Sequence, residues 1–436
     1  MYIKSVEINN VRSISNFTMA FPQLAGWHVL IGDNGVGKSS IVRAIALALI
    51  GQIQAQGLRA NWDDWLKKGA TTGSIKLNAF MDSKLDSFKL EGKPVKFTAK
   101  DNSVTFLMEF VRGKNPVEIE VKDSFLLTNK KTPISYRYTN DWKGAFSVAY
   151  GPYRRFEGNN SELERLFRSP SYSDLAGHLS VFSESVALSE VVEWLKYLHH
   201  KSLEKQKESE DTLKNLKTLI NSADFLPHGA KLESVNSDGV FFKDGNGTTI
   251  AINQMSDGYR SILSLTLELI RQLTRVYGAK LVFRNIQREH KTIDLPGVVL
   301  IDEIDAHLHP TWQTRIGQWF TRYFPNLQFI VTTHSPLVCR ASEQGSIWRL
   351  AAPGSDGESG EVTGLERDRL IYGNILDAYG TEVFGENVSI SQDSNKMLNR
   401  LAELNVKSMM GQITDQENTE LQELRAKFPT ETKIKK

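Results

Sequence analysis

The stretch that decides the fold is "VLIGDNGVGKSSIVRAIALALIG", residues 29–51, in which a glycine-rich loop lies between an apolar run and a long apolar segment. Gly32, Gly37, Lys38 and Ser39 fit the pattern G-x-x-x-x-G-K-[ST]. The run before the loop predicts a buried strand, and the segment after it predicts a helix. This is the context in which the pattern binds phosphate.

The chemistry of such a loop predicts ATP and Mg²⁺ as cofactors. Glycines let backbone N–H groups turn toward the β-phosphate, and the following helix adds the positive end of its dipole. We expect Lys38 to bridge the β- and γ-phosphates and the Ser39 hydroxyl to ligate Mg²⁺. A glycine-rich turn without a ligand is the alternative. The other loop residues expected to contact the nucleotide are Asn34, Gly35, Gly37 and Ser40.

A second motif, "LPGVVLIDEIDAHLHP" at residues 295–310, predicts a buried strand that ends in two carboxylates. The carboxyl ends of parallel strands form the ligand edge of an open α/β sheet. We therefore expect Asp302 to belong to the Mg²⁺ shell and Glu303 to orient or deprotonate the attacking water. His307 and His309 are two residues apart, but this loop offers no convincing third ligand for a metal site.

Two further motifs stand at the starts of loops or helices. "TTHSP", residues 332–336, follows an apolar strand, and its His334 is either a γ-phosphate contact or a structural histidine; we favour the contact. "MSDG", residues 255–258, opens a strongly apolar helix with Ser256 and Gly258, and such a helix N-terminus can bind an anion.

In this order, "GDNGVGKSS", "MSDG", "LIDEID" and "TTHSP" resemble the motifs of the ABC-type ATPases of the SMC, RecF and OLD group. The resemblance implies that two head domains sandwich two ATP molecules. Ser256 and Gly258 of one subunit would then contact the γ-phosphate bound by Lys38 of the other, and hydrolysis would need a dimer.

The resemblance also assigns three single residues. Asp305 falls in the loop that crosses the dimer interface, and His334 falls at the switch histidine of the group. "VRSI" is similar to the N-terminal Arg-Ser motif, which implies a nucleotide-side contact for Arg12; a solvated strand end is the alternative. "YGPYRRFEG", residues 150–158, offers no glutamine for a Q-loop, so none is assigned.

The predicted fold class is α/β, an ABC-type (SMC/RecF-like) P-loop ATPase head with an antiparallel β subdomain, a short helical arm insertion and a C-terminal helical extension. Alternating runs within residues 75–150, including 146–150, predict one antiparallel sheet, and 239–252 predicts a hairpin. Thr414 and Glu417 fit a capping box.

The predicted domains are 1–155, an N-terminal head lobe with the P-loop and β subdomain; 156–231, the arm; 232–350, a C-terminal head lobe with the signature, Walker B and switch histidine; and 351–436, a helical extension for partner docking or for packing on the head.

Composition fits an ordinary globular protein. The 436 residues are 40% hydrophobic and 24% charged with a net charge of +2, so DNA binding would need a local basic patch. The single cysteine, Cys339, excludes an intramolecular disulfide and fits a reducing compartment, where a buried hydrophobic role is favoured over a reactive thiol. No run approaches the roughly 20 apolar residues of a membrane span, and the first residues alternate like a strand. We expect a cytoplasmic protein without a membrane partner.

The compact head, short arm and tail look like the ATPase subunits of two-gene anti-phage systems, such as the Septu-type PtuA proteins paired with an HNH nuclease. This implies an ATPase that forms a homodimer or higher oligomer and controls a partner nuclease. We expect no nuclease domain in this chain, because the extension has no second carboxylate cluster. A transporter motor subunit or a scaffold fits the motifs less well. The alternative is a RecF-like DNA repair ATPase. In that case the DNA phosphates would be contacted by Tyr153, Arg154, Arg155, Arg165 and Arg168. Surface salt bridges are the other role that these arginines could have.

Overall fold

The structure is a computed structural model of the chain. It describes residues 1–55, 62–90, 93–98, 102–113, 119–127, 134–135, 139–153, 173–183, 190–222, 225–226, 229–289, 291–351, 359–374 and 392–427. The chain forms two compact units, Met1–Tyr372 and Gly373–Lys436. The subdivision of the first unit at residues 155, 231 and 350 stays a prediction.

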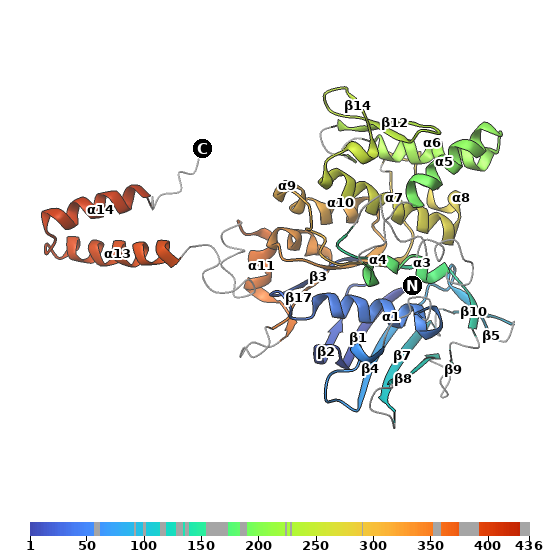
Figure 1. Cartoon of the computed structure of the whole chain (residues 1–436), viewed down its shortest axis with the longest axis horizontal. Coiled ribbons are helices and arrows are strands. Elements are labelled where there is room, and N and C mark those ends of the chain that lie inside the picture. Colours follow the sequence, from blue (N-terminus) through green and yellow to red (C-terminus); the bar gives the residue numbers. More distant parts are fainter. Residues whose placement is uncertain are drawn as a thin grey trace. The chain divides into compact units, whose positions relative to one another are not determined.

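A parallel sheet forms the centre of the first unit (Figure 1). Its strands lie in the order β11-β15-β16-β3-β17-β18, and all neighbours except β17 and β18 are parallel. Every residue of β3, β15 and β16 is buried, which explains their mostly apolar sequences; the polar exceptions are His28, Gln328 and Thr332. The strands are β11 (Ser147–Tyr150), β15 (Gly297–Ile301), β16 (Leu327–Thr332), β3 (Gly26–Ile31), β17 (Ile347–Arg349) and β18 (Gly360–Glu361).

The antiparallel sheet that the sequence predicts is present, with the strand order β2-β1-β4-β7-β8-β9. Buried and half-buried residues alternate along β4, so one face of this strand is turned to the core. The strands are β1 (Tyr2–Val11), β2 (Ile14–Ala20), β4 (Thr72–Phe80), β7 (Ser103–Arg112), β8 (Ile119–Leu127) and β9 (Ile134–Ser135). A small sheet beside it contains β5 (Ser87–Leu90), β6 (Lys93–Lys96) and β10 (Thr139–Lys143).

The prediction for residues 146–150 was wrong in one respect. They do not join the antiparallel sheet: β11 pairs in parallel with β15, and Tyr150 lies opposite Ile301. Val148, Ala149 and Tyr150 are all buried in succession. A strand covered on both faces belongs in a parallel sheet between layers rather than in a sheet with one solvated face.

Helix α1 (Lys38–Ala55) lies between the two sheets (Figure 1). One hydrophobic core joins its side chains to Ile8 and Leu77 of the antiparallel sheet and to Leu300 and Ile330 of the parallel sheet. A helix covered on two sides needs apolar residues around most of its circumference, as the sequence after the P-loop has.

The opposite face of the parallel sheet is covered by α7, the helix that "MSDG" opens, and by α10 (Figure 1). The Trp27 ring of β3 stacks on Phe320 of α10 with ring centroids 6.0 Å apart. The helices of this layer are α7 (Asp257–Tyr277), α8 (Ala279–Val282), α9 (Pro310–Gln313) and α10 (Ile316–Tyr323). The short helices around the two sheets are η2 (Trp62–Asp64), α3 (Ser173–Ala176), α4 (Leu179–Phe182), η6 (Ile252–Gln254), η7 (Pro336–Gln344) and α11 (Gly364–Tyr372).

Within the predicted arm, residues 156–231, the longest described helices are α5 (Glu190–Leu203) and α6 (Lys207–Ile220), and α5 packs on α7. The assignment of 156–231 as an arm stays a prediction. The predicted hairpin at 239–252 is confirmed: β13 (Val240–Lys243) pairs with β14 (Thr249–Ala251), and β12 (Lys231–Val235) completes the sheet. Cys339 is fully buried, as predicted. None of the helices in the described part of the chain combines the length and apolar character needed to cross a bilayer.

Between residues 392 and 427, the described part of the second unit forms a helical hairpin of α13 (Gln392–Met409) and α14 (Asp415–Lys427). Its small core contains Leu401, Leu404, Leu421 and Leu424. The predicted capping box is present: the Glu417 amide donates to Thr414 Oγ1 at 3.3 Å, and the Thr414 amide donates to Glu417 Oε2 at 3.0 Å.

Candidate nucleotide-binding site

The P-loop connects β3 to α1 and needs glycine at specific positions. Gly35 and Gly37 have φ angles of 80° and 106°, which residues with a Cβ rarely adopt. A Cβ on Gly37 would also lie 3.1 Å from Ser13 Oγ. Asn34 and Gly35 are exposed at the rim of the loop, and Ser40 is half-buried in the first turn of α1. The loop backbone directly before the N-terminus of α1 is suited to an anion.

The Lys38 side chain lies across this loop and is buried. Its Nζ donates hydrogen bonds to the carbonyl oxygens of Gly32, at 2.7 Å, and Asp33, at 2.8 Å. Burial lowers the pKa of Lys38, and nearby carboxylates, Glu303 foremost, oppose this shift. The ammonium group is thus held at the loop by carbonyl oxygens that phosphate oxygens could replace.

The second half of the site comes from the end of β15. Ser39 Oγ donates to Asp302 Oδ1 at 3.1 Å, and Thr332 Oγ1 donates to the same oxygen at 2.6 Å. Asp302 is 1% exposed, so hydroxyl donors replace water around its carboxylate. The sheet order explains the contact, because β16 lies between β3 and β15 and all three strands end at the same edge.

Glu303 and Asp305 follow on the same loop. The Glu303 amide donates to Thr332 Oγ1 at 2.7 Å, and Glu303 has a φ of 48°, which is unusual for a residue with a side chain. Thr333 Oγ1 donates to Asp305 Oδ1 at 2.6 Å. No sequence pattern points to either threonine. They are the first two residues of "TTHSP", in which the predicted contact residue is His334, a half-buried side chain.

The residues of "MSDG", which the resemblance places at the signature motif of the ABC-type ATPases, lie at another hollow of the first unit. Ser256 is the N-cap of α7, and its exposed side chain makes no capping hydrogen bond to a described residue. A Cβ on Gly258 would lie 3.3 Å from the carbonyl oxygen of His307. A cavity of about 450 Å³ lies at this end of α7. It is lined by Ser256, Gly258, Tyr259, Ile262, Leu308, His309, Thr311, Trp312 and Arg315. None of these lining residues belongs to the P-loop.

Arg12 is half-buried at the turn between β1 and β2. Its amide donates to the Trp65 carbonyl at 2.8 Å, and its guanidinium Cζ lies 5.4 Å from the centroid of the Trp65 ring. Burial, and to a lesser degree Arg43, lowers the pKa of Arg12. The predicted nucleotide contact of Arg12 stays a prediction. Tyr153 is half-buried, whereas Arg154, Arg155, Arg165 and Arg168 lie outside the described residues.

The donor set fits Mg²⁺ bound together with ATP. A serine hydroxyl and a carboxylate are hard oxygen ligands, and Mg²⁺ usually takes few protein ligands in addition to phosphates and water. Among the described residues, no group of three or more His, Cys, Asp or Glu side chains could hold a metal by itself. Lys38, Ser39 and Asp302 therefore suit a metal ion that arrives with a nucleotide.

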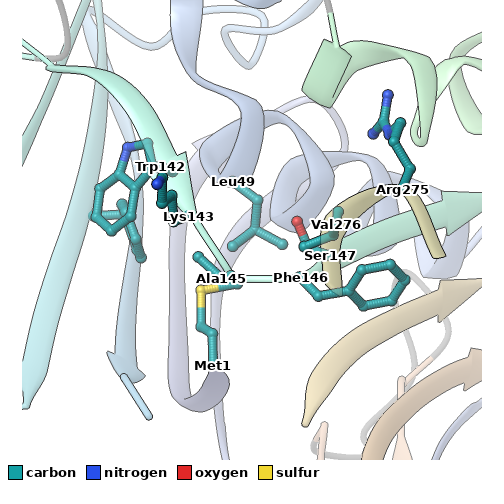
Figure 2. A pocket seen from close by; sticks show the side chains of 11 residues that line it. Met1, Leu49, Trp142, Lys143, Ala145, Phe146, Ser147, Arg275 and Val276 are labelled. Atoms are coloured by element: carbon teal, nitrogen blue, oxygen red, sulfur yellow. The ribbon is translucent and has the colours of Figure 1, made fainter. Parts of the chain in front are cut away.

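A separate cavity of about 260 Å³ lies at the amino end of β11, away from the P-loop edge of the sheet. Figure 2 shows Leu49 of α1 between Trp142 on one side and Phe146 on the other, with Arg275 of α7 nearby. None of the residues that line this cavity belongs to the predicted nucleotide site.

The fold and the site together define a P-loop ATPase. Residues 28–340 match the family described as "AAA domain, putative AbiEii toxin, Type IV TA system", and the chain belongs to this family. The family match bears out the predicted fold class.

Similar proteins agree with this assignment. The chain is 29% identical over 353 residues to the Septu protein PtuA of Bacillus mycoides (strain KBAB4). The aligned region covers 79% of this chain and 40% of that protein. It is 26% identical over 461 residues to the "Retron Ec83 probable ATPase" of Escherichia coli. The aligned region covers 91% of this chain and 82% of that protein. The predicted similarity to PtuA-type ATPases is confirmed. The chain spans less than half the length of the B. mycoides protein.

Among solved structures, the chain is similar to an Smc head bound to the C-winged helix domain of ScpA. The TM-score is 0.48 and the sequence identity 18%, with 84% of this chain and 99% of that chain covered.

Proposed function

We propose that this protein is a cytoplasmic ATPase of an anti-phage defence system, which hydrolyses ATP in a head-to-head dimer and thereby controls a partner nuclease. The observation that carries the ATPase part is the hydrogen bond from Ser39 to Asp302. It joins the residue after the P-loop lysine to the first carboxylate of "DEID", as a shared Mg²⁺ site requires.

Each residue of the site has a chemical role in this proposal. Lys38 would exchange its two carbonyl partners for phosphate oxygens, and Ser39 and Asp302 would hold Mg²⁺. Bound Mg²⁺ neutralises charge on the phosphates. Glu303 follows Asp302 on the same loop and would take a proton from the attacking water or orient it.

The dimer part of the proposal is supported by the position of the signature residues. Ser256 and Gly258 line a hollow without P-loop residues, and the Ser256 side chain is exposed. An exposed helix N-terminus can contact a phosphate presented by a second copy. In a two-fold symmetric assembly the same surface serves both subunits, so two equal sites would form. Asp305 would lie at the same interface.

The partner part of the proposal is supported by the relatives. A Septu protein and a retron ATPase are both similar to this chain over most of its length. The resemblance to Septu-type ATPases implies an HNH nuclease as partner, so we propose a nuclease of this kind. The hairpin of α13 and α14 would be a docking element. Nucleotide binding would shift the population toward the closed dimer because ATP binds that state more tightly.

Purification of tagged Glu303→Gln protein from its native host, with ATP and Mg²⁺, tests this function. Mass spectrometry identifies the copurifying proteins, and light scattering gives the mass of the complex. A stoichiometric nuclease supports the proposal. DNA and repair proteins without a nuclease, together with salt-sensitive DNA binding by the protein alone, would favour the RecF-like alternative.

A further inference from the structure

We infer that Thr332 is a positioning residue of the ATPase site, whose hydroxyl group orders Asp302 and the Glu303 backbone at the same time. This inference rests on the proposed ATPase function and deepens it. It concerns a residue whose hydroxyl group contacts both carboxylate-bearing residues at the start of the loop after β15.

The geometry at Thr332 uses both abilities of a hydroxyl group. Oγ1 donates its proton to Asp302 Oδ1 at 2.6 Å and accepts the Glu303 N–H at 2.7 Å. A threonine hydroxyl has one proton to donate and two lone pairs, so the two bonds are compatible. Thr332 is completely buried, so water cannot take over either bond easily.

The backbone of Thr332 contributes a third bond to the same loop. Ile304 N donates to the Thr332 carbonyl at 3.0 Å, while Asp302 N donates to the carbonyl of Tyr150 at 2.8 Å. Two of three successive amides of the "DEI" segment are therefore held by Thr332. Glu303, which lies between these two bonds, has a φ of 48°. A residue with a side chain keeps such a left-handed backbone conformation only when its surroundings hold it.

The neighbouring threonine has a different role. Thr333 Oγ1 donates to Asp305 Oδ1 at 2.6 Å and accepts the Ser335 N–H at 3.0 Å. Each threonine of "TTHSP" thus holds one carboxylate of "DEID". Only Thr332 binds the aspartate that contacts Ser39, so its loss is expected to act on the metal-dependent part of nucleotide binding.

The change that isolates the hydroxyl group is Thr332→Val, which keeps the branched shape. It removes one donor from the Asp302 carboxylate and leaves the Glu303 N–H without its acceptor. Partners that orient metal ligands typically contribute about 10–100-fold in metal affinity or activity. We expect the gain in ATP affinity on adding Mg²⁺ to fall about 10-fold and kcat to fall about 10–100-fold. Binding in EDTA, which depends on Lys38 and the loop, stays within about twofold of wild type.

The experiment titrates a fluorescent ATP analogue into the full-length protein with Mg²⁺ and with EDTA, and measures hydrolysis against Mg²⁺ concentration. Thr332→Ser restores the hydroxyl and should recover most of the Mg²⁺ effect. Thr212→Val is the matched control: Thr212 is also buried, but it donates to the Glu208 carbonyl within the arm at 2.7 Å. It should leave both titrations unchanged. Thermal unfolding verifies that each variant folds. If Thr332→Val does not fold, the same titrations compare Thr332→Ala with Thr332→Ser.

Two results overturn the inference alone. One is a folded Thr332→Val protein with the wild-type Mg²⁺ effect and kcat; the other is a folded Thr332→Ser protein as impaired as Thr332→Val. A wild-type protein that shows no Mg²⁺-dependent binding of the analogue would instead overturn the proposed function, and the inference with it.

Discussion

The Ser39 hydroxyl donates a hydrogen bond to Asp302 Oδ1 at 3.1 Å, although 263 positions separate the two residues in the chain. The contact exists because β3 and β15 flank β16 and run in the same direction. Both strands therefore deliver their following loops to one edge of the sheet. The same edge receives "TTHSP" from β16, so three distant motifs form one site.

Lys38→Ala tests the phosphate contact of the P-loop. We expect ATP binding to weaken about 10–100-fold, because hydrogen bonds from a charged group contribute about 1.5–3 kcal/mol. Isothermal titration with ATP and Mg²⁺ measures the loss. Lys4→Ala, at an exposed position of β1, is the control and should bind like wild type. Equal affinities for the two variants would exclude Lys38 from the nucleotide site.

Glu303→Gln tests the role of the second carboxylate. The amide keeps the shape of the side chain but cannot accept the proton, so hydrolysis should fall about 10²–10⁴-fold while ATP still binds. Closed dimers should accumulate, which light scattering detects as a doubled mass. Glu193→Gln, on the surface of the arm, should leave turnover unchanged. Wild-type turnover in Glu303→Gln would remove Glu303 from the mechanism.

A buried histidine in the P-loop strand should make stability depend on pH. His28 Nε2 lies 3.3 Å from the carbonyl of Leu24, which can only accept, so Nε2 carries the proton and Nδ1 accepts from Ser346 Oγ at 2.9 Å. Burial lowers the pKa of His28 to about 4, against about 6.5 in an unfolded chain. Between these values the unfolded chain binds more protons, so acidification favours unfolding.

From this one group, the free energy of unfolding should fall by up to roughly 3 kcal/mol as the pH drops from about 6.5 to about 4. Urea denaturation at several pH values measures it. His28→Gln should be less stable at pH 7 but should lack this part of the pH dependence, whereas His200→Gln, at an exposed position, should keep it. An unchanged slope in His28→Gln would contradict the assignment.

The helical hairpin of the second unit should depend on very few side chains. Leu404 is completely buried in a core of four leucines, and Leu→Ala changes in cores cost about 2–5 kcal/mol. Leu404→Ala should therefore raise amide hydrogen exchange throughout residues 392–427 and leave ATP binding intact. Val406→Ala, on the exposed side of α13, should change neither. Equal exchange in the two variants would show that the leucine core does not hold the hairpin together.

The local parts of the fold and site were predictable from the sequence because their signals are local. The glycines, Lys38 and Ser39 occur at fixed spacing, and "LIDEID" ends an apolar strand. The hairpin at 239–252 and the capping box at Thr414 follow from turn and cap chemistry within a few residues.

Pairings between distant strands were less predictable. Residues 146–150 were placed in the wrong sheet, because a short apolar run does not reveal which layers will cover it. Thr332 and Thr333 were missed for a related reason. Their bonds to Asp302 and Asp305 depend on the register that sets Ile301 opposite Val331, which no local pattern encodes.

Mixing two inactive variants tests the composite ATPase site most directly. Ser256→Arg should block hydrolysis without weakening ATP binding to a subunit. Lys38→Ala should weaken ATP binding about 10–100-fold, so its own P-loop stays largely empty at an ATP concentration near the wild-type dissociation constant. Coexpressed with different tags, the two form heterodimers in which one site carries both defects and the other carries neither. The account predicts that the mixture regains about a quarter of wild-type ATPase activity, since half the dimers then contain one intact site. Activity no higher than that of either variant alone would contradict a site shared between two heads.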